Sequence, residues 1–165
     1  MRTRLVAVLV GCVLGHAAAA SASDSQIERA TLAGLTPVSV VVEALAPIAA
    51  KGGLTVAALE SDVTARLKQA GIAVTQDADA YLYVHVTVAD PGAQLPLPYL
   101  VEVTLMQEVT LPRGIKTRTP LQMPTWWLNR LGMTDASRLR AAVSDRVGEF
   151  VDQFIVAYRS VNARP

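Results

Sequence analysis

The stretch Ala80–Asp90, AYLYVHVTVAD, decides the fold class. One alternating set of its residues is aliphatic: Leu82, Val84, Val86 and Val88. The other set is aromatic or polar: Tyr81, Tyr83, His85 and Thr87. Because successive side chains of a strand point to opposite faces, this pattern predicts a strand with one core face and one amphipathic face.

Four other segments carry strand signals. In Tyr99–Leu111 the apolar set is Val101, Val103, Leu105, Val109 and Leu111, and the opposite set is Glu102, Thr104, Met106 and Glu108. The DPGAQLPLP segment before it predicts a loop longer than a two-residue turn. We also expect a first strand at Val38–Glu43, a short second strand at Ile72–Val74 and a weak strand at Ile115–Thr119, which nearby prolines confine to an edge.

Two segments predict amphipathic helices. The first begins at the N-cap Thr55 and ends at Gly71, and its apolar stripe is Val56, Leu59, Val63, Leu67 and Ala70. The second begins at the N-cap Thr134 and runs towards Asn162. Its wider stripe, broad enough to cover most of one sheet face, is Leu139, Val143, Val147, Phe150, Val151, Phe154, Ile155, Tyr158 and Val161.

These elements predict an α+β fold in the order β-α-β-β-β-(β)-α. We expect a mostly antiparallel sheet of about four to five strands, with both helices on one face. Pro47 and Lys51–Gly53 are interpreted as a loop after the first strand. No internal repeat or long linker divides the chain, so residues 23–165 form a single predicted domain.

The N-terminus, MRTRLVAVLVGCVLGHAAAASAS, has the organisation of a secretory signal. Arg2 and Arg4 precede the apolar run Leu5–Leu14, and the small residues of Ala17–Ala22 follow. The run is shorter than the roughly 20 residues that a transmembrane helix needs. We therefore predict a signal peptide over residues 1–22 with cleavage near Ala20 or Ala22, and no transmembrane helix in the mature chain.

The stretch LVGC, Leu9–Cys12, has the form of a lipobox and leaves two alternatives open. Cleavage before Cys12 would leave an apolar segment at the lower limit of about 7 residues, which favours the later cut. The protein is then periplasmic or secreted, and in the lipobox alternative it is a periplasmic lipoprotein anchored through Cys12. After the later cut the mature chain has no cysteine, which excludes disulfides and thiol catalysis.

The charges are distributed unevenly along the chain. Residues 24–108 contain 10 acidic and 4 basic side chains, whereas residues 109–165 contain 9 basic and 4 acidic ones. The bases interleave with apolar positions of the predicted long helix, which favours a solvated helix face over a basic docking surface. A near-neutral exported chain is not expected to bind nucleic acid.

Catalytic patterns are weak in this sequence. His85 is the only histidine left once His16 is removed with the signal, and no Gly-x-Ser-x-Gly motif is present. Lys51–Gly53 lacks the ending that grips a phosphate, and the Asp77/Asp79 pair lacks the other ligands of a calcium loop. We therefore predict no enzyme, no cofactor and no metal site.

Apolar and aromatic surfaces are the remaining candidates for binding. Tyr81, Tyr83, His85 and Met106 lie on the sheet face that the helices leave uncovered, unless another segment packs over them. In the stiff loop Gln94–Tyr99, the apolar side chains Leu95, Leu97 and Tyr99 form either a second contact or a buried loop tip.

Trp126 and Trp127 form a third candidate region. In an extended segment their side chains cannot face the same side. We expect one to plug the end of the sheet against the long helix and the other to be partly exposed near Arg130. The exposed one either binds a sugar or a lipid headgroup, or is a core residue with a snorkelling neighbour.

Several fragments together resemble a group of small exported bacterial proteins of unknown function. They are TLAGLTPVSVVVEAL, ESDVTARLKQAGIAV, AYLYVHV, VEVTLMQEVTL, the PTW of Pro124–Trp126 and EFVDQFIVAYRSVN. More distantly, the order of elements is similar to that of periplasmic auxiliary lipoproteins of outer-membrane assembly and transport systems. That resemblance implies an envelope location, and in such lipoproteins a lipid anchor.

The sequence favours a non-enzymatic accessory or binding protein of the cell envelope that contacts a protein partner or lipid. A second hypothesis is a small-ligand or lipid carrier, with the ligand held between the sheet and the C-terminal helix near Trp126, Trp127 and Phe150. A third is an enzyme that uses His85.

Overall fold

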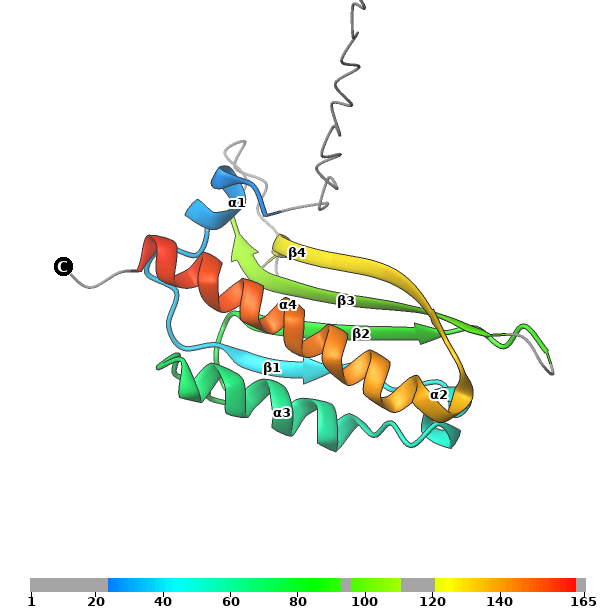
Figure 1. The fold of residues 1–165 in the computed structure, drawn as a ribbon. Coiled ribbons are helices and arrows are strands. Elements are labelled where there is room, and N and C mark those ends of the chain that lie inside the picture. The colour runs from blue at the N-terminus through cyan, green and yellow to red at the C-terminus, as the bar shows by residue number, and fades with distance from the viewer. Residues whose placement is uncertain (1–23, 93–95, 111–120, 163–165) are drawn as a thin grey trace, which may run out of the picture.

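A four-stranded sheet forms the centre of the molecule (Figure 1). The structure is a computed structural model and describes residues 24–92, 96–110 and 121–162. The strands are β1 (Ser39–Val42), β2 (Tyr81–Val88), β3 (Leu97–Val109) and β4 (Leu121–Thr134), and they lie side by side in that order. The β1–β2 pair is parallel and the other pairs are antiparallel, which confirms the predicted mostly antiparallel α+β sheet.

Two long helices, α3 (Val56–Gln69) and α4 (Leu139–Val161), pack on the same face of the sheet, as predicted (Figure 1). Their buried side chains are those of the predicted apolar stripes, among them Leu59, Val63 and Leu67 on α3. Short helices α1 (Gln26–Ala30) and α2 (Pro47–Lys51) lie near opposite ends of α4. A 3₁₀ turn, η1 (Ala136–Arg138), precedes α4.

The parallel pair β1–β2 requires a crossover, which α2 and α3 provide. The crossover helix begins as its sequence predicts, because the Thr55 hydroxyl accepts a hydrogen bond of 3.2 Å from the backbone N–H of Ala58. It ends before Gly71, whose φ of 82° is the left-handed conformation that glycine adopts without strain.

Several predicted boundaries were wrong. Ile72–Val74 is not a strand, and only a single parallel bridge joins Val74 to Val38. The segment from Pro47 to Lys51 is helical rather than a loop. Thr134 is the last residue of β4 rather than the N-cap of the long helix, and the turn begins instead at Asp135. The predicted strand Ile115–Thr119 lies outside the described residues.

The long strand β4 is the element that the sequence analysis missed. Its pairing with β3 contains an irregularity between Leu105 and Met106, where Leu105 pairs with Trp126 and Met106 pairs with Pro124. Thr125 is therefore an extra residue on β4, as in a β-bulge. The bulge lets the strand continue past a proline, and it sets the faces on which the two tryptophans lie.

The core lies between the sheet and the helices. Trp126, Phe150 and Phe154 are among its largest fully buried side chains. The rings of Trp126 and Phe154 meet edge to face, with centroids 5.2 Å apart. One tryptophan therefore packs against the long helix, as predicted.

Candidate functional site

The face of the sheet opposite α3 and α4 carries the candidate site, which we call the open face. Its residues come from all four strands: Val41, Tyr81, Tyr83, His85, Thr87, Leu100, Glu102, Thr104, Met106, Trp127, Asn129, Leu131 and Met133. Their alternating neighbours Leu82, Val84, Val101 and Val103 are completely buried on the helical side. In the described part of the chain, the long helices contact only that helical side (Figure 1).

Two predicted candidate regions meet on the open face. Tyr81 pairs with Met106 across β2 and β3, and Tyr83 pairs with Thr104, whose partner on β4 is Trp127. Trp127 is half-buried there, whereas its neighbour Trp126 is fully buried on the other face. The alternation predicted for the two tryptophans is confirmed, but the expected position of the exposed one near Arg130 is wrong, because Arg130 lies on the helical side of β4.

Aromatic rings form a row along β2. Tyr81 and Tyr83 meet edge to face with centroids 6.5 Å apart. Tyr83 and the His85 ring are also 6.5 Å apart and nearly parallel, with an angle of 16° between their planes. We call Tyr81, Tyr83 and His85 the aromatic row.

Glu43 organises this row, and the sequence analysis did not single it out. Glu43 directly follows β1, and its side chain lies on the open face. One oxygen of its carboxylate binds both the Tyr83 hydroxyl and Nδ1 of His85. The hydrogen bonds from Tyr83 and His85 lower the pKa of Glu43. The hydrogen bond between Tyr83 and Glu43 favours the neutral phenol and therefore raises the pKa of Tyr83 to about 12.

A hydrogen-bonded chain continues from Glu43 through His85 to a hydroxyl group. Nε2 of His85 lies 2.7 Å from Oγ1 of Thr87. A carboxylate can only accept, so in neutral His85 the proton sits on Nδ1 and Nε2 accepts from Thr87. This is the order of a carboxylate–imidazole–hydroxyl relay. The side chains of His85 and Glu43 are 31% and 43% exposed, so water reaches the relay.

Leu97 and Tyr99, two further candidate residues, are not available on the open face. Leu97 and Tyr99 belong to strand β3 rather than to a loop, and both are buried. The ring of Tyr99 lies across Gly132, where a side-chain Cβ would overlap it. Leu95 and Cys12 lie outside the described residues. The expectation of an apolar contact loop over Gln94–Tyr99 is therefore wrong for Leu97 and Tyr99.

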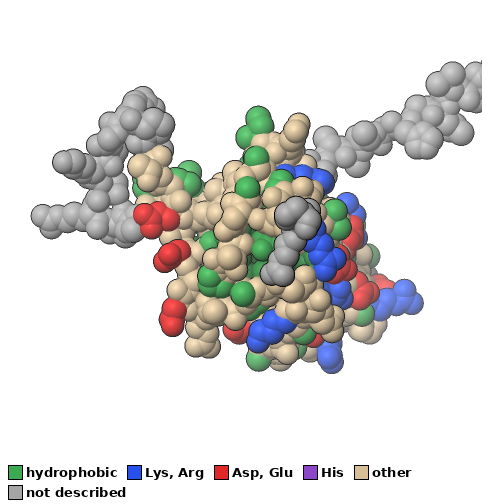
Figure 2. All heavy atoms as spheres, turned by 90° about the vertical axis from the view of Figure 1, so that its left-hand side faces the viewer, with side chains coloured by type: hydrophobic (Ala, Val, Ile, Leu, Met, Phe, Trp, Pro, Cys, Tyr) green, Lys and Arg blue, Asp and Glu red, His purple; other side chains and the backbone are tan. Residues whose placement is uncertain are grey.

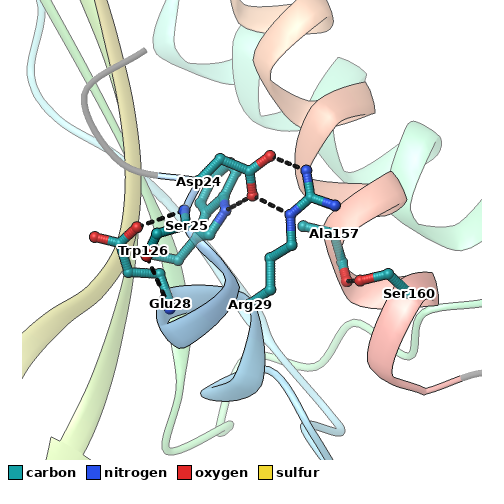
Figure 3. A network of polar contacts seen from close by, with 7 residues as sticks. All are labelled: Asp24, Ser25, Glu28, Arg29, Trp126, Ala157 and Ser160. Carbon is teal, nitrogen blue, oxygen red and sulfur yellow. Dashed lines mark hydrogen bonds and ion pairs between the residues drawn. The ribbon is translucent and has the colours of Figure 1, made fainter. Parts of the chain in front are cut away.

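Trp126 has a structural role at the end of the sheet (Figure 3). Its indole N–H donates to Oδ1 of Asp24 at 2.9 Å, and Nε of Arg29 donates to the same oxygen at 2.8 Å. The Ser25 hydroxyl and the Glu28 carboxylate cap helix α1 reciprocally. Trp126 thus links α1 to β4 from a fully buried position.

Two cavities lie away from the aromatic row. One, of about 460 Å³, lies between α3 and α4 and is lined by Arg66, Asp145, Glu149, Asp152, Gln153 and Val156. Another, also about 460 Å³, lies beside α2 and is lined in part by Ile48, Lys51 and Leu97. Among the described residues there is no cluster of three potential metal ligands. Nor does any described helix have the length and apolar character needed to span a membrane.

Comparison with known proteins does not establish a family. No family model and no curated protein matches the chain. A minor lipoprotein from Acinetobacter baumannii is 16% identical with a TM-score of 0.36, and the match covers 73% of this chain and 93% of that one. A PelC dodecamer from Paraburkholderia phytofirmans is 14% identical with a TM-score of 0.41, and the match covers 80% and 95%. At these scores neither likeness bears on what this chain binds.

Proposed function

We propose that the protein is a non-enzymatic accessory protein of the bacterial cell envelope that binds a protein partner through its open face. The observation that carries the proposal is the convergence of Tyr81, Tyr83, His85, Met106 and Trp127 on one side of the sheet. Leu131 and Met133 extend the same surface and are 69% and 67% exposed. Exposed apolar surface of this kind is typical of interaction sites.

Substitution of Leu131 tests the proposal. We expect L131S to lose a partner that co-purifies with the tagged wild-type protein from envelope extracts. V156S is the matched control, because Val156 is 60% exposed on the helical side. Loss of the partner from V156S with retention by L131S would place the interface on the helices and contradict the proposal.

The Glu43–His85–Thr87 relay favours a second candidate function, hydrolysis with the Thr87 hydroxyl as nucleophile. Hydrolases of this kind also need donors aimed at the developing oxyanion and a site from which water is excluded. The exposure of Glu43 and His85 argues against such exclusion. T87V keeps the shape of the side chain and removes the hydroxyl, so ester hydrolysis that T87V abolishes would favour this candidate.

A further inference from the structure

The open face is acidic. Glu102 of β3 lies opposite His85, Glu108 is on the same side of β3, and Glu43 stands beside the aromatic row. Glu102 is half-buried and has no ion-pair partner among the described residues. The carboxylates therefore share the surface with the aromatic rings.

Basic side chains of the described residues lie elsewhere. All described lysines and arginines except Arg130 belong to α-helices or to the 3₁₀ turn η1. Arg130 is on the helical side of β4, where it pairs with Glu149 of α4 at 3.5 Å. Viewed from the α1 end, Lys and Arg gather on one side of the molecule, and the opposite side shows acidic side chains without them (Figure 2). The described part of the open face thus has negative charge with no arginine or lysine to balance it.

Aromatic faces and carboxylates both attract cations. A guanidinium or ammonium group stacks on tyrosine and tryptophan rings, and a carboxylate accepts its hydrogen bonds. The aromatic row presents its rings between Glu43 and Glu102. Arginine suits such a surface better than lysine, because its planar group can stack and donate at the same time.

We propose that the open face binds a cationic segment of a protein partner, in which arginine side chains reach the aromatic row and Glu102. The inference rests on the proposed function and adds the chemistry of the partner. The charge complementarity of the face carries it. The groove between α3 and α4 is also rich in acids, but there Arg66 already binds Asp152 at 2.9 Å.

A synthetic peptide in which arginine and valine alternate tests this inference. Backbone NMR spectra of the isotope-labelled protein report where the peptide binds and how tightly. We expect shifts at Tyr83, Thr104 and Trp127, and much weaker binding of an analogue with glutamine in place of arginine. E102Q should weaken binding by about two- to fivefold, the range of an exposed ion pair. E60Q on α3 is the matched control and should leave the affinity unchanged.

The outcomes separate this inference from the proposed function. If the glutamine analogue binds the open face as tightly as the arginine peptide, the cationic chemistry is wrong and an open-face interface stands. If the arginine peptide shifts only helix resonances, or if E60Q weakens binding as much as E102Q, attraction is non-specific and the inference fails. Failure of the peptide to bind at all would also overturn it, while the L131S co-purification still decides the proposed function.

Discussion

Glu43 is the side chain that fixes the geometry of the aromatic row, because its carboxylate holds both Tyr83 and His85. The hydrogen bond between Glu43 and Tyr83 raises the pKa of Tyr83 to about 12, so the folded state favours the protonated phenol. This hydrogen bond contributes its full stabilisation of the fold below the ordinary tyrosine pKa of about 10. The contribution is lost as the pH rises through the raised pKa of Tyr83.

The pKa of Tyr83 therefore provides the first prediction. In an alkaline titration followed by tyrosinate absorbance, we expect the ionisation of Tyr83 near pH 12. E43Q should move this step back towards about 10, because the hydrogen bond to a charged acceptor, which favours the protonated phenol, is gone. Y83F should remove the step and Y81F should leave it. A wild-type titration with no step near pH 12 that Y83F removes would contradict this account.

Asp24 is a second residue that stabilises the fold, because one oxygen of its carboxylate accepts hydrogen bonds from both Arg29 and the buried indole of Trp126. We expect D24A to lower the free energy of unfolding by about 1–3 kcal/mol, the cost of leaving a buried donor unsatisfied. Urea denaturation measures the change, and D77A at an exposed loop position is the control. Combining D24A with W126F should cost less than the sum of the two changes, since both remove one interaction.

At the scale of the element, strand β4 packs against β3 through a close contact between Gly132 and Tyr99. The ring of Tyr99 rests where a side chain at position 132 would be. Gly148 on α4 makes a similar contact with the guanidinium group of Arg66, at 2.7 Å from a Cβ built there. A side chain at position 132 would have to displace the Tyr99 ring, whereas one at position 148 would have to displace only the end of the Arg66 side chain.

These contacts predict different effects of the same substitution. G132A should destabilise the protein by about 1–3 kcal/mol, because a packed ring in a core cannot move easily. G148A should be nearly neutral or stabilising, because the end of an arginine side chain can swing away and alanine favours a helix by up to about 1 kcal/mol. Thermal unfolding of the two variants measures the difference. Equal destabilisation by both would contradict the contact between Tyr99 and Gly132.

The elements could be predicted where their periodicity was regular. The stripes of α3 and α4 and the alternation of β2 have clear apolar periods, and their buried residues lie where the sequence placed them. Strand β4 was missed because Pro124 interrupts the pattern, and the bulge at Thr125 that accommodates it is a property of the pairing with β3. The loop before β3 was predicted to be too long because prolines such as Pro98 favour a loop, although Leu97 and Tyr99 continue the alternation of β3.

At the scale of the whole molecule, part of the site could be predicted and part could not. Alternation along β2 and β3 placed Tyr81, Tyr83, His85 and Met106 together. Trp127 could not be added to them, because a single sequence does not say which strand neighbours which. The same limit applies to Glu43, which reaches the aromatic row only because β1 pairs in parallel with β2. Val41 and Glu43 are two residues apart and so lie on the same face of β1. This would have placed Glu43 beside the aromatic row if β2 had been known to neighbour β1.

The central claim is that one side of the sheet is covered by helices and the other is the surface that a partner contacts. Photo-crosslinking in cells that produce the protein tests it most directly, with a photoreactive phenylalanine analogue introduced at Leu131 in one strain and at Val156 in another. We predict a specific adduct from position 131, which L100S or E102Q in the same chain weakens, and none from position 156. An adduct from position 156 alone would contradict the claim.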